Sequence, residues 1–408
     1  MADKALAIAF NGKAVSQDFY EDIVSLTVTE NFNSANTLEL RLATELNENG
    51  AWAYLEDKRL DPFTKVSVKF GFTSGGGLAG ALGLQASAPG GNDGLEPIFD
   101  GYITSVQVNL SSDPANAQIE IGALDTSVLL SLEEKITTWK GMSDSQIAEQ
   151  IIGSYRGVSV RADSTATVHQ ETDTTIVQRS TDIQFVRELA TLNGLEFYFE
   201  TEKNSGKITG FFRAPQLGGK PQPDLAIQFG DQSNLFTFSA RLVGQRPLNV
   251  KVEQMDLKGN SPNTGQASET RLRKLGDKDA NSLVGGPLGS LLPKDAQAQM
   301  LVLGPPTSNA TELRTIAQAV RDEAAWFINA EGEINSDAYQ TVLRPHRLVL
   351  VKGAGKPFSG KYYVTRVVHQ LMGDGTYAQR FEARRNARDV DGSEQFGGVG
   401  LGQPIPGV

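Results

Sequence analysis

The sequence predicts a mainly β protein in which two related β modules flank a mixed α/β region. A block of residues near position 102 recurs near position 363, which indicates an internal repeat. Short segments that alternate apolar and polar residues surround both blocks, whereas amphipathic helical patterns occur between them. The chain of 408 residues and 43.9 kDa exceeds the usual size of one hydrophobic core, so two to four domains are expected.

The repeat consists of two blocks that occur twice in the same order. Residues 60–69 (LDPFTKVSVK) match residues 343–352 (LRPHRLVLVK), and residues 102–118 match residues 363–379 without a gap. The identities in the second block are Tyr102, Thr104, Val106, Leu110, Asp113, Ala117 and Gln118 with Tyr363, Thr365, Val367, Leu371, Asp374, Ala378 and Gln379. The first copy is longer between its blocks, and the extra residues fall in the stretch TSGGGLAGALGLQASAPGGNDG. Because two separate blocks agree in order, we infer two copies of one β module.

Each copy is expected to form a small barrel or a sandwich. In KVSVKFGF, residues 65–72, apolar side chains occupy every second position, which is the period of a half-buried strand. The segments TLELRLA and AQIEIGA alternate in the same way. Several such strands at short spacing, separated by turn residues, are typical of small barrels and sandwiches.

Two helices are predicted between the copies, each with a capping box. Ser143 with Gln146 begins the first helix, and Thr181 with Gln184 begins the second; this spacing is typical of a helix N-terminus. Gly194 stands where a C-cap glycine belongs, and the aromatic segment LEFYFE follows directly as a predicted strand. A compact α/β module is therefore expected between the repeats.

The remaining patterns complete the domain organisation. A third helix is predicted over residues 311–329, whose apolar residues recur at helical spacing. Residues 256–308 are rich in Gly, Pro, Asn and Ser, which predicts a long insertion or loop. The expected domains are 1–127, a first barrel with a Gly-rich insertion near 73–97; 128–235, an α/β module; 236–388, a second barrel with a long insertion near 256–330; and 389–408, an extended tail.

Composition argues against several classes of site. The chain has no cysteine, which excludes disulfides, thiol nucleophiles and cysteine metal sites. His169, His346 and His369 are far apart and lack metal-site spacing, so neither a metal nor another cofactor is expected. A net charge of −10 and a pI near 5.0 argue against sequence-specific nucleic acid binding. No apolar run approaches a membrane span, and the N-terminus lacks the pattern of a secretory signal.

Three local features could carry chemistry. Residues 75–80 fit the pattern GxGxxG, but the glycines and proline that follow would prevent a helix from presenting its amides to a phosphate. Glu133 and Glu134 stay open as a glycosidase pair, because the separation of two carboxylates depends on the fold. His369 occupies the repeat position of Val108, and we therefore expect it to be structural.

Three longer segments, in the correct order, carry a family resemblance. They are KITTWKGMSDSQIAEQIIGSYRGV, TDIQFVRELATLNGLEFYFE and LRPHRLVLVKGAGKPFSGKYYVTRVVHQLMGDGTYAQRFEARRNA. Together they resemble the phage late control D and VgrG-like family, the baseplate hubs of contractile phage tails and injection systems. The resemblance covers most of residues 1–388 and is strongest over 130–200 and 340–388.

The resemblance implies a structural hub and not an enzyme. Its fold would contain two tube-type β-barrels joined by mixed α/β domains. Three chains with two barrels each would form a pseudo-hexameric ring that couples a hexameric tail tube to a trimeric spike and allows cargo or DNA to pass. The expected partners are two further copies of the chain, the tube protein, the spike and other baseplate proteins. The chain would be made in the bacterial cytoplasm and assembled into the baseplate of a phage tail or an injection particle.

The C-terminus and two alternative functions complete these expectations. This sequence stops about twenty residues after FEARRNA, without the needle domain of VgrG chains, so we expect the spike to be a separate polypeptide. Phe396, Leu401 and Ile405 are candidate anchors through which the C-terminal tail would dock the spike or a neighbouring protein. A tail-associated cell-wall hydrolase and a carbohydrate-binding tail protein are the alternative functions.

Overall fold

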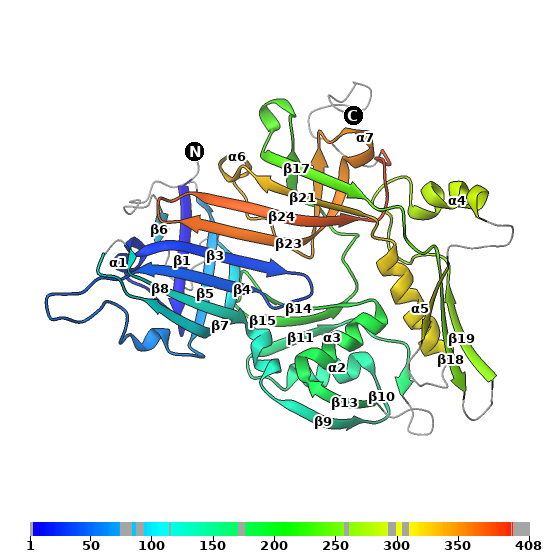
Figure 1. Cartoon of the computed structure of the whole chain (residues 1–408), viewed down its shortest axis with the longest axis horizontal. Coiled ribbons are helices and arrows are strands. Elements are labelled where there is room, and N and C mark those ends of the chain that lie inside the picture. The colour runs from blue at the N-terminus through cyan, green and yellow to red at the C-terminus, as the bar shows by residue number, and fades with distance from the viewer. Residues whose placement is uncertain are drawn as a thin grey trace.

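A sheet of 14 strands dominates the protein (Figure 1). The computed structural model describes residues 3–73, 84–86, 94–113, 116–169, 176–256, 261–292, 299–303, 310–392 and 394. The main path of the sheet runs β17-β21-β24-β23-β3-β4-β8-β7-β5-β1-β2, and β6, β16 and β22 pair beside this path. The prediction of a mainly β protein is therefore confirmed.

The N-terminal copy (residues 3–125) supplies one end of the sheet. Its elements are β1 (Asp3–Phe10), β2 (Lys13–Ala14), α1 (Gln17–Glu21), β3 (Ile23–Asn31), β4 (Thr37–Ala43), β5 (Lys65–Thr73), β6 (Leu84–Ala86), β7 (Glu96–Asn109) and β8 (Gln118–Asp125). Six of these strands lie in the order β1-β5-β7-β8-β4-β3. Apart from β6, the Gly-rich insertion predicted near 73–97 lies mostly outside the residues that the structure describes.

The C-terminal copy (residues 222–385) supplies the other end. Its elements are β16 (Gln222–Ala226), β17 (Leu235–Leu242), β21 (Ile328–Ile334), α6 (Ser336–Tyr339), β22 (Leu348–Lys352), α7 (Gly355–Phe358), β23 (Gly360–Met372) and β24 (Tyr377–Arg385). The six strands lie in the order β16-β22-β23-β24-β21-β17, which repeats the order of the N-terminal copy. One difference is direction, because β16 is parallel to β22 whereas β1 is antiparallel to β5.

The pairing register of the two copies also agrees. Lys65 of β5 lies opposite Tyr102 of β7, and Leu348 of β22 lies opposite Tyr363 of β23, as the sequence repeat requires. The next pairs correspond as well: Val66–Gly101, Ser67–Asp100 and Val68–Phe99 in one copy, Val349–Tyr362, Leu350–Lys361 and Val351–Gly360 in the other. The repeat predicted from the sequence is thus confirmed at the level of individual residue pairs.

Irregular features recur at corresponding positions. The register of β7 against β8 shifts at Thr104, and that of β23 against β24 shifts at Thr365. Each threonine hydroxyl donates to a carbonyl of the adjacent strand, to Gly122 at 3.3 Å and to Glu382 at 3.1 Å. A second pair of bulges occurs at matching places in β3–β4 and β17–β21. Bulges re-aim a strand, so their recurrence gives both copies the same curvature.

A strained turn before β5 and β22 is repeated too. Phe63 and His346 both have a positive φ, 61° and 58°, which is uncommon for residues with a β-carbon. Their amides donate to the matching carbonyls, Ile103 at 2.8 Å and Val364 at 2.9 Å. The same backbone conformation is therefore fixed by the same hydrogen bond in both copies.

The sequence match without gaps is wrong by one residue after the turns that connect β7 to β8 and β23 to β24. Gln118 lies opposite Asn109, whereas the residue opposite Gln370 is Ala378 and not Gln379. One residue fewer lies between the paired positions 370 and 378 than between 109 and 118. A shorter turn shifts register without disturbing the strands, which a comparison of the two segments without gaps could not reveal.

The two copies are joined edge to edge by β3 and β23. Residues 360–363 of β23 pair with β22 and residues 366–372 pair with β3, while β24 occupies the opposite edge. Two hydrophobic cores lie under the sheet, one built mostly by the N-terminal copy and one by the C-terminal copy. Leu371 and Tyr377 of the C-terminal copy belong to the N-terminal core, so the joint is part of both copies.

The α/β module packs beside the sheet (Figure 1). It contains β9 (Glu134–Trp139), β10 (Met142–Ser143), α2 (Asp144–Gly153), β11 (Val158–Ala162), β12 (Val168–His169), β13 (Ile176–Thr181), α3 (Asp182–Asn193), β14 (Glu196–Thr201) and β15 (Ile208–Arg213). Both predicted capping boxes are present, and Gly194 ends α3 in the left-handed conformation at φ 69°. These three predictions are confirmed. They could be made from the sequence because helix caps depend on a few neighbouring residues.

The region between β17 and β21 corrects two predictions. It contains β18 (Asn249–Asp256), β19 (Ser261–Ala267), α4 (Gly286–Leu291), β20 (Gln299–Leu303) and α5 (Ala310–Ala324). The segment 256–308, predicted as a long insertion or a loop, is not a loop, because it includes two strands that pair with β18 under α5. The helix predicted over 311–329 ends at Ala324, because Ile328 begins a strand that pairs with β24. Tertiary pairing overrides the local pattern in both places.

Candidate functional site: the polar face of the sheet

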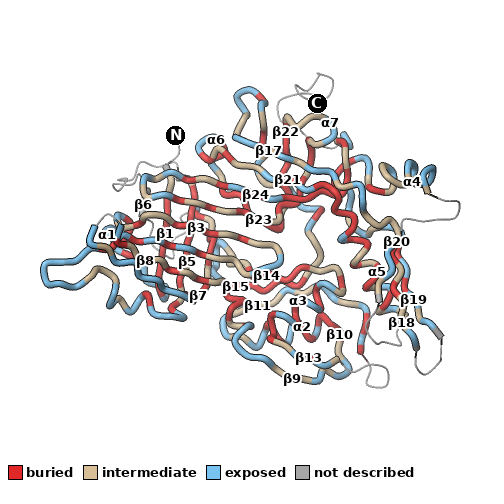
Figure 2. Tube along the Cα trace, viewed as in Figure 1, coloured by how far each residue is buried: buried red, intermediate tan, exposed pale blue. Residues whose placement is uncertain are grey.

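One face of the long sheet is apolar and buried, and the other is polar. Along β4, Leu38, Leu40 and Leu42 are buried and alternate with outward residues such as Glu39 and Arg41. A similar alternation occurs along β8, β3 and β24, where buried residues alternate with intermediate ones in β8 and β3 and also with exposed ones in β24 (Figure 2). Strand pleating sends successive side chains to opposite faces, so the sequence pattern sets the two faces.

The polar face continues across the joint without interruption. Cross-strand pairs connect it: Glu39 opposite Thr27, Thr27 opposite Gln370, and Thr29 opposite Val368. Its members on the described strands are Ser105, Gln107, Asn109, Glu120, Glu39, Arg41, Ser25, Thr27, Thr29, Arg366, Val368, Gln370, Arg380, Glu382, Glu331, Glu333, Thr237, Ser239 and Arg241. We call this surface the polar face.

Ion pairs cross the strands of the polar face. Arg41 binds Glu120 at 3.1 Å between β4 and β8. The corresponding positions of the C-terminal copy hold Glu333 and Arg380, which are 3.3 Å apart with the charges exchanged. Because these side chains are solvated, each pair contributes little to stability, about 0–1 kcal/mol. Their main effect is to neutralise charge on the surface.

Charges on the polar face nearly balance. Its arginines are Arg41, Arg241, Arg366 and Arg380, and its acids are Glu39, Glu120, Glu331, Glu333 and Glu382. A shallow groove of about 600 Å³ crosses the face over β17, β21, β24 and β23. Hydroxyl and charged side chains line it together with Gly332, Val368 and Phe381, and the ion pairs Arg366–Glu382 and Arg380–Glu333 leave no strong field of one sign.

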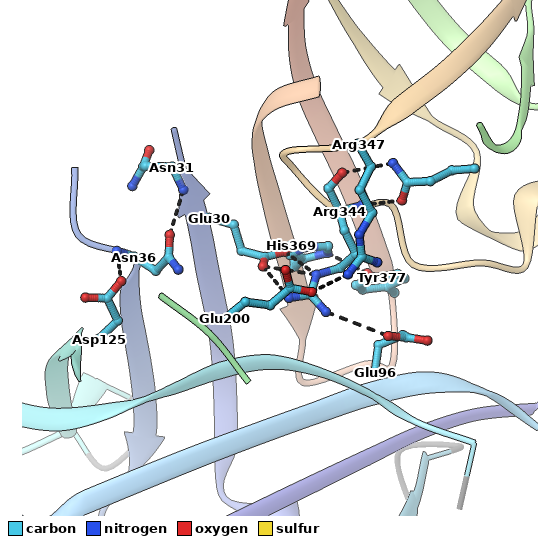
Figure 3. A network of polar contacts seen from close by, with 11 residues as sticks. Glu30, Asn31, Asn36, Glu96, Asp125, Glu200, Arg344, Arg347, His369 and Tyr377 are labelled. Carbon is cyan, nitrogen blue, oxygen red and sulfur yellow. Dashed lines mark hydrogen bonds and ion pairs between the residues drawn. The ribbon is translucent and has the colours of Figure 1, made fainter. Parts of the chain in front are cut away.

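A buried polar network holds the joint behind this face (Figure 3). Arg344 donates to both carboxylate oxygens of Glu30, at 2.7–3.0 Å. His369 Nε2 lies 3.0 Å from the same carboxylate, and its Nδ1 lies 2.7 Å from the Tyr377 hydroxyl. If Nε2 donates to Glu30, Nδ1 accepts from the tyrosine, which fixes one tautomer. All four side chains are buried, and they tie β3 to β23, β24 and the segment before β22.

Electrostatics keeps this network charged. Burial by itself would raise the pKa of Glu30, but Arg344 and the hydrogen bond from His369 outweigh it, and the pKa lies below its usual value. Arg344 keeps its proton because Glu30, Glu200 and Glu96 surround it and raise its pKa despite burial. Burial and the charge of Glu30 raise the pKa of Tyr377 well above 10. A buried pair with complete hydrogen bonds is the arrangement in which buried charge is tolerated.

A second buried network fastens the α/β module to the C-terminal copy. Glu196 of β14 accepts from the Tyr363 hydroxyl at 2.6 Å and lies 2.9 Å from His346 Nδ1. The His346 ring stacks on Tyr198 with centroids 3.5 Å apart. Desolvation and the Glu196 charge raise the pKa of Tyr363 well above its ordinary value. The left-handed turn at His346 therefore aims its ring into this contact.

The structure separates the residues that the sequence suggested for chemistry. Phe396, Leu401 and Ile405 lie outside the described residues, and so does the GxGxxG segment. The three histidines lie in three different contacts, with Asp144, Glu196 and Glu30 as acidic partners. Within the described ranges there is no cluster of three or more metal-ligating side chains. No helix there is long and apolar enough to cross a membrane.

Sequence reasoning missed the Glu30–Arg344 pair. These residues are 314 positions apart, and nothing in the repeat block that contains Arg344 points to Glu30. One signal was available, because His369 replaces the apolar Val108 of the other copy. A polar residue on the apolar side of a repeated strand indicates that the two copies have different neighbours there.

Several solved structures share this fold. The 43 kDa tail protein of prophage MuSo2 from Shewanella oneidensis has 12% identity and a TM-score of 0.60, over 95% of this chain and 100% of that one. A tail protein from Neisseria meningitidis has 11% identity and a TM-score of 0.60, over 94% and 97%. The E. coli c3393 protein, a type VI secretion component similar to T4 tail proteins, has 13% identity and a TM-score of 0.53, over 93% and 76%.

Sequence comparisons give a family assignment. No curated protein matches the chain. The family model described as the Alg8 N-terminal domain matches residues 88–373, which is more than half of the chain. That segment runs from just before β7 into the end of β23 and includes the whole α/β module. The protein therefore belongs to the Alg8 N-terminal domain family, with a fold shared by phage tail and type VI secretion proteins.

Proposed function

We propose that this chain is the structural baseplate hub of a contractile phage tail or injection machine. Three chains form a ring. In that ring the N-terminal copy and the C-terminal copy of each chain alternate, which gives six quasi-equivalent tube-type barrels. A hexameric tail tube binds one side of the ring, and a separately encoded trimeric spike binds the other. The shared strand order, register and bulges of the two copies support this proposal, because two equivalent modules per chain convert threefold into approximate sixfold symmetry.

The polar face is the wall of the conduit in this proposal. A wall of one charge would either hold a nucleic acid or repel it, whereas a hydrophilic wall with balanced charge allows passage. The exchanged ion pairs Arg41–Glu120 and Glu333–Arg380 support this role, since both copies neutralise the same position. The similarity in fold to phage tail proteins agrees with it.

The chain acts without catalysis in this proposal. The three most deeply buried acids of the described residues already have structural partners: Asp182 binds Lys135 at 2.6 Å, Glu30 binds Arg344, and Glu196 binds Tyr363. The C-terminal tail, with Phe396, Leu401 and Ile405, docks the spike or another baseplate protein. Incubation of the purified chain with peptidoglycan tests the first statement, because release of soluble fragments would assign a hydrolase instead.

The ring is tested by mass. Light scattering of the purified full chain should give three times 43.9 kDa, and electron micrographs should show a ring with a central opening. Adding the tube protein from the same gene cluster should produce stacked complexes on one side of the ring. A chain that stays monomeric alone and with tube protein would contradict the proposal.

A further inference from the structure

Corresponding segments of β7 and β23 have different surroundings. The outer segment of β23 (residues 366–372) has β24 on one edge and β3 on the other. The outer segment of β7 (residues 105–109), which Leu110 follows directly, pairs with β8 on one edge, and no described strand pairs with its other edge. At the end of the sheet path, β17 pairs only with β21 among the described strands. Among the described strands, the outer segment of β7 and the far edge of β17 are therefore unpaired, and so is the far edge of β16.

The side chains of the β7 segment lack the cover that their counterparts have. Val367, His369 and Leu371 of β23 are 0–2% exposed. The corresponding residues Val106, Val108 and Leu110 are 38%, 41% and 48% exposed. Val106 and Val108 lie opposite the fully buried Ile121 and Ile119, on the apolar side of the sheet. An apolar stripe that continues a core face into solvent indicates an interaction surface.

The internal joint shows what belongs on that edge. In the joint, β3 of the N-terminal copy covers the outer segment of β23. The element that corresponds to β3 in the C-terminal copy is β17, because both end their copy's strand order and share a bulge. A covering β17 cannot come from the same chain, since β17 and β7 are separated by six strands along the sheet path. The covering β17 must come from a second chain.

We propose that β17 of one subunit pairs antiparallel with the outer segment of β7 of a second copy of this chain. This inference rests on the proposed ring and names the contact that closes it. The register follows from the joint, where Val367 lies opposite Glu30 and His369 lies opposite Val28. The equivalent pairs between subunits are Val106 with Leu242, Gln107 with Arg241, Val108 with Ala240, Asn109 with Ser239, and Leu110 with Phe238.

The chemistry of the two edges agrees with this register. Leu242 is 36% exposed, so the pairing would cover it together with Val106 and Val108. On the other side of the sheet, Asn109 meets Ser239 and Gln107 meets Arg241, which continues the polar face from one subunit to the next. Edge strands left open promote uncontrolled pairing, and closure into a ring removes them. The contact is head-to-tail, as a closed ring requires.

Disulfide trapping tests the register. The chain has no cysteine, so every disulfide that forms must involve the introduced residues. We expect the double variant Val108→Cys/Ala240→Cys to form disulfides between subunits under mild oxidation. Directly opposed residues of antiparallel strands are about 4.5–5.5 Å apart at Cα, within disulfide range. Non-reducing gels should show a ladder that ends at three chains. The control Val108→Cys/Arg241→Cys places the thiols on opposite faces and should stay uncrosslinked.

A charge variant gives an independent readout. Val108→Asp should abolish the ring at concentrations where the wild type is trimeric, and the monomer should keep its circular dichroism and melting temperature. Ile136→Asp on β9, where the wild-type side chain is 85% exposed, is the matched control and should leave the ring intact. Rings that form without crosslinks at 108 and 240, or that survive Val108→Asp, would overturn this contact but not the proposed function. A monomeric wild type without crosslinks would overturn both.

Discussion

The outer segments of β7 and β23 are the same element in two environments. Both follow a bulge at a threonine, and both pair with the next strand of their copy. In β23 the segment is covered within the chain and includes His369, which is tied to Glu30 and Tyr377. In β7 it carries valines and a leucine, and solvent reaches them. One repeated strand therefore supports a permanent polar joint in one copy and an open apolar edge in the other.

The difference between the two segments indicates which interactions hold the internal joint and which would hold the proposed contact between subunits. Positions equivalent to Glu30 and His369 are Leu242 and Val108, so a contact between subunits would be apolar where the internal joint is ionic. A buried ion pair gives register and specificity more than net stability. Apolar contacts can form between separately folded chains without first stranding an unpaired charge in either monomer. The following predictions, in order of decreasing effect, test this contrast.

The largest effect is expected from removing one partner of the buried pair. Arg344→Met leaves the Glu30 carboxylate buried without its cation, which should lower the free energy of unfolding by about 3–5 kcal/mol. Urea titration followed by circular dichroism measures it. In the triple variant Glu30→Leu/Arg344→Met/His369→Val, the changes at 30 and 369 copy Leu242 and Val108 of the other edge and the change at 344 removes the cation, so this variant should recover more than half of the loss. A triple variant as unstable as Arg344→Met would mean that this joint requires charge.

A smaller effect is expected at a core position where the two copies have cross-strand pairs of different size. Leu40 opposite Ile121 in the N-terminal copy corresponds to Gly332 opposite Phe381 in the C-terminal copy. A β-carbon at Gly332 would lie 2.6 Å from the Thr237 carbonyl oxygen and 2.8 Å from the Phe381 ring.

We therefore expect Gly332→Ala to destabilise the protein by about 1–3 kcal/mol. Phe381→Ile in the same chain removes the clash with the ring, so a double-mutant cycle should give favourable coupling of at least about 0.5 kcal/mol. Strictly additive effects would show that the glycine responds only to the backbone of β17.

Acid should weaken the internal joint and leave an apolar contact unchanged. The pKa of Glu30 is lowered in the folded chain, so the unfolded chain takes up the proton first. The contribution of Glu30 is complete above about pH 4.3, its ordinary pKa, and is lost as pH falls through the folded value. Unfolding measured from pH 6 to pH 3 should show a steeper loss for the wild type than for the triple variant. Equal slopes would assign the acid sensitivity to other carboxylates.

The smallest effect is expected on the polar face. Exchanging the charges in Arg41→Glu/Glu120→Arg reproduces the order found at Glu333 and Arg380, so stability should change by less than about 0.5 kcal/mol. Arg41→Glu alone places a glutamate opposite Glu120 and should lower the free energy of unfolding by up to about 1 kcal/mol. Thermal melts at low and high salt measure both variants. A single variant whose cost does not fall with salt would show that the pair is held by packing instead of by charge.

Local signals in the sequence determined much of the fold. The capping boxes at Ser143 and Thr181 and the C-cap at Gly194 could be predicted because each depends on a few neighbouring residues. The repeat around Tyr102 and Tyr363 identified equivalent strands, since period-two alternation and the bulged threonines are properties of one strand and its partner. Of the two alternatives for residues 256–308, an insertion or a loop, the loop is wrong because β19 is stabilised by β18 and α5 and not by its own composition.

Only the tertiary structure decided how the two copies differ. The sequence by itself determined two related β modules around an α/β module, because periodicity and capping are local. It could not show that β3 covers β23, that Glu30 meets Arg344, or that no described strand covers the outer edge of β7. Such contacts join residues hundreds of positions apart, and their free energy depends on what burial removes from water, which no segment of sequence records.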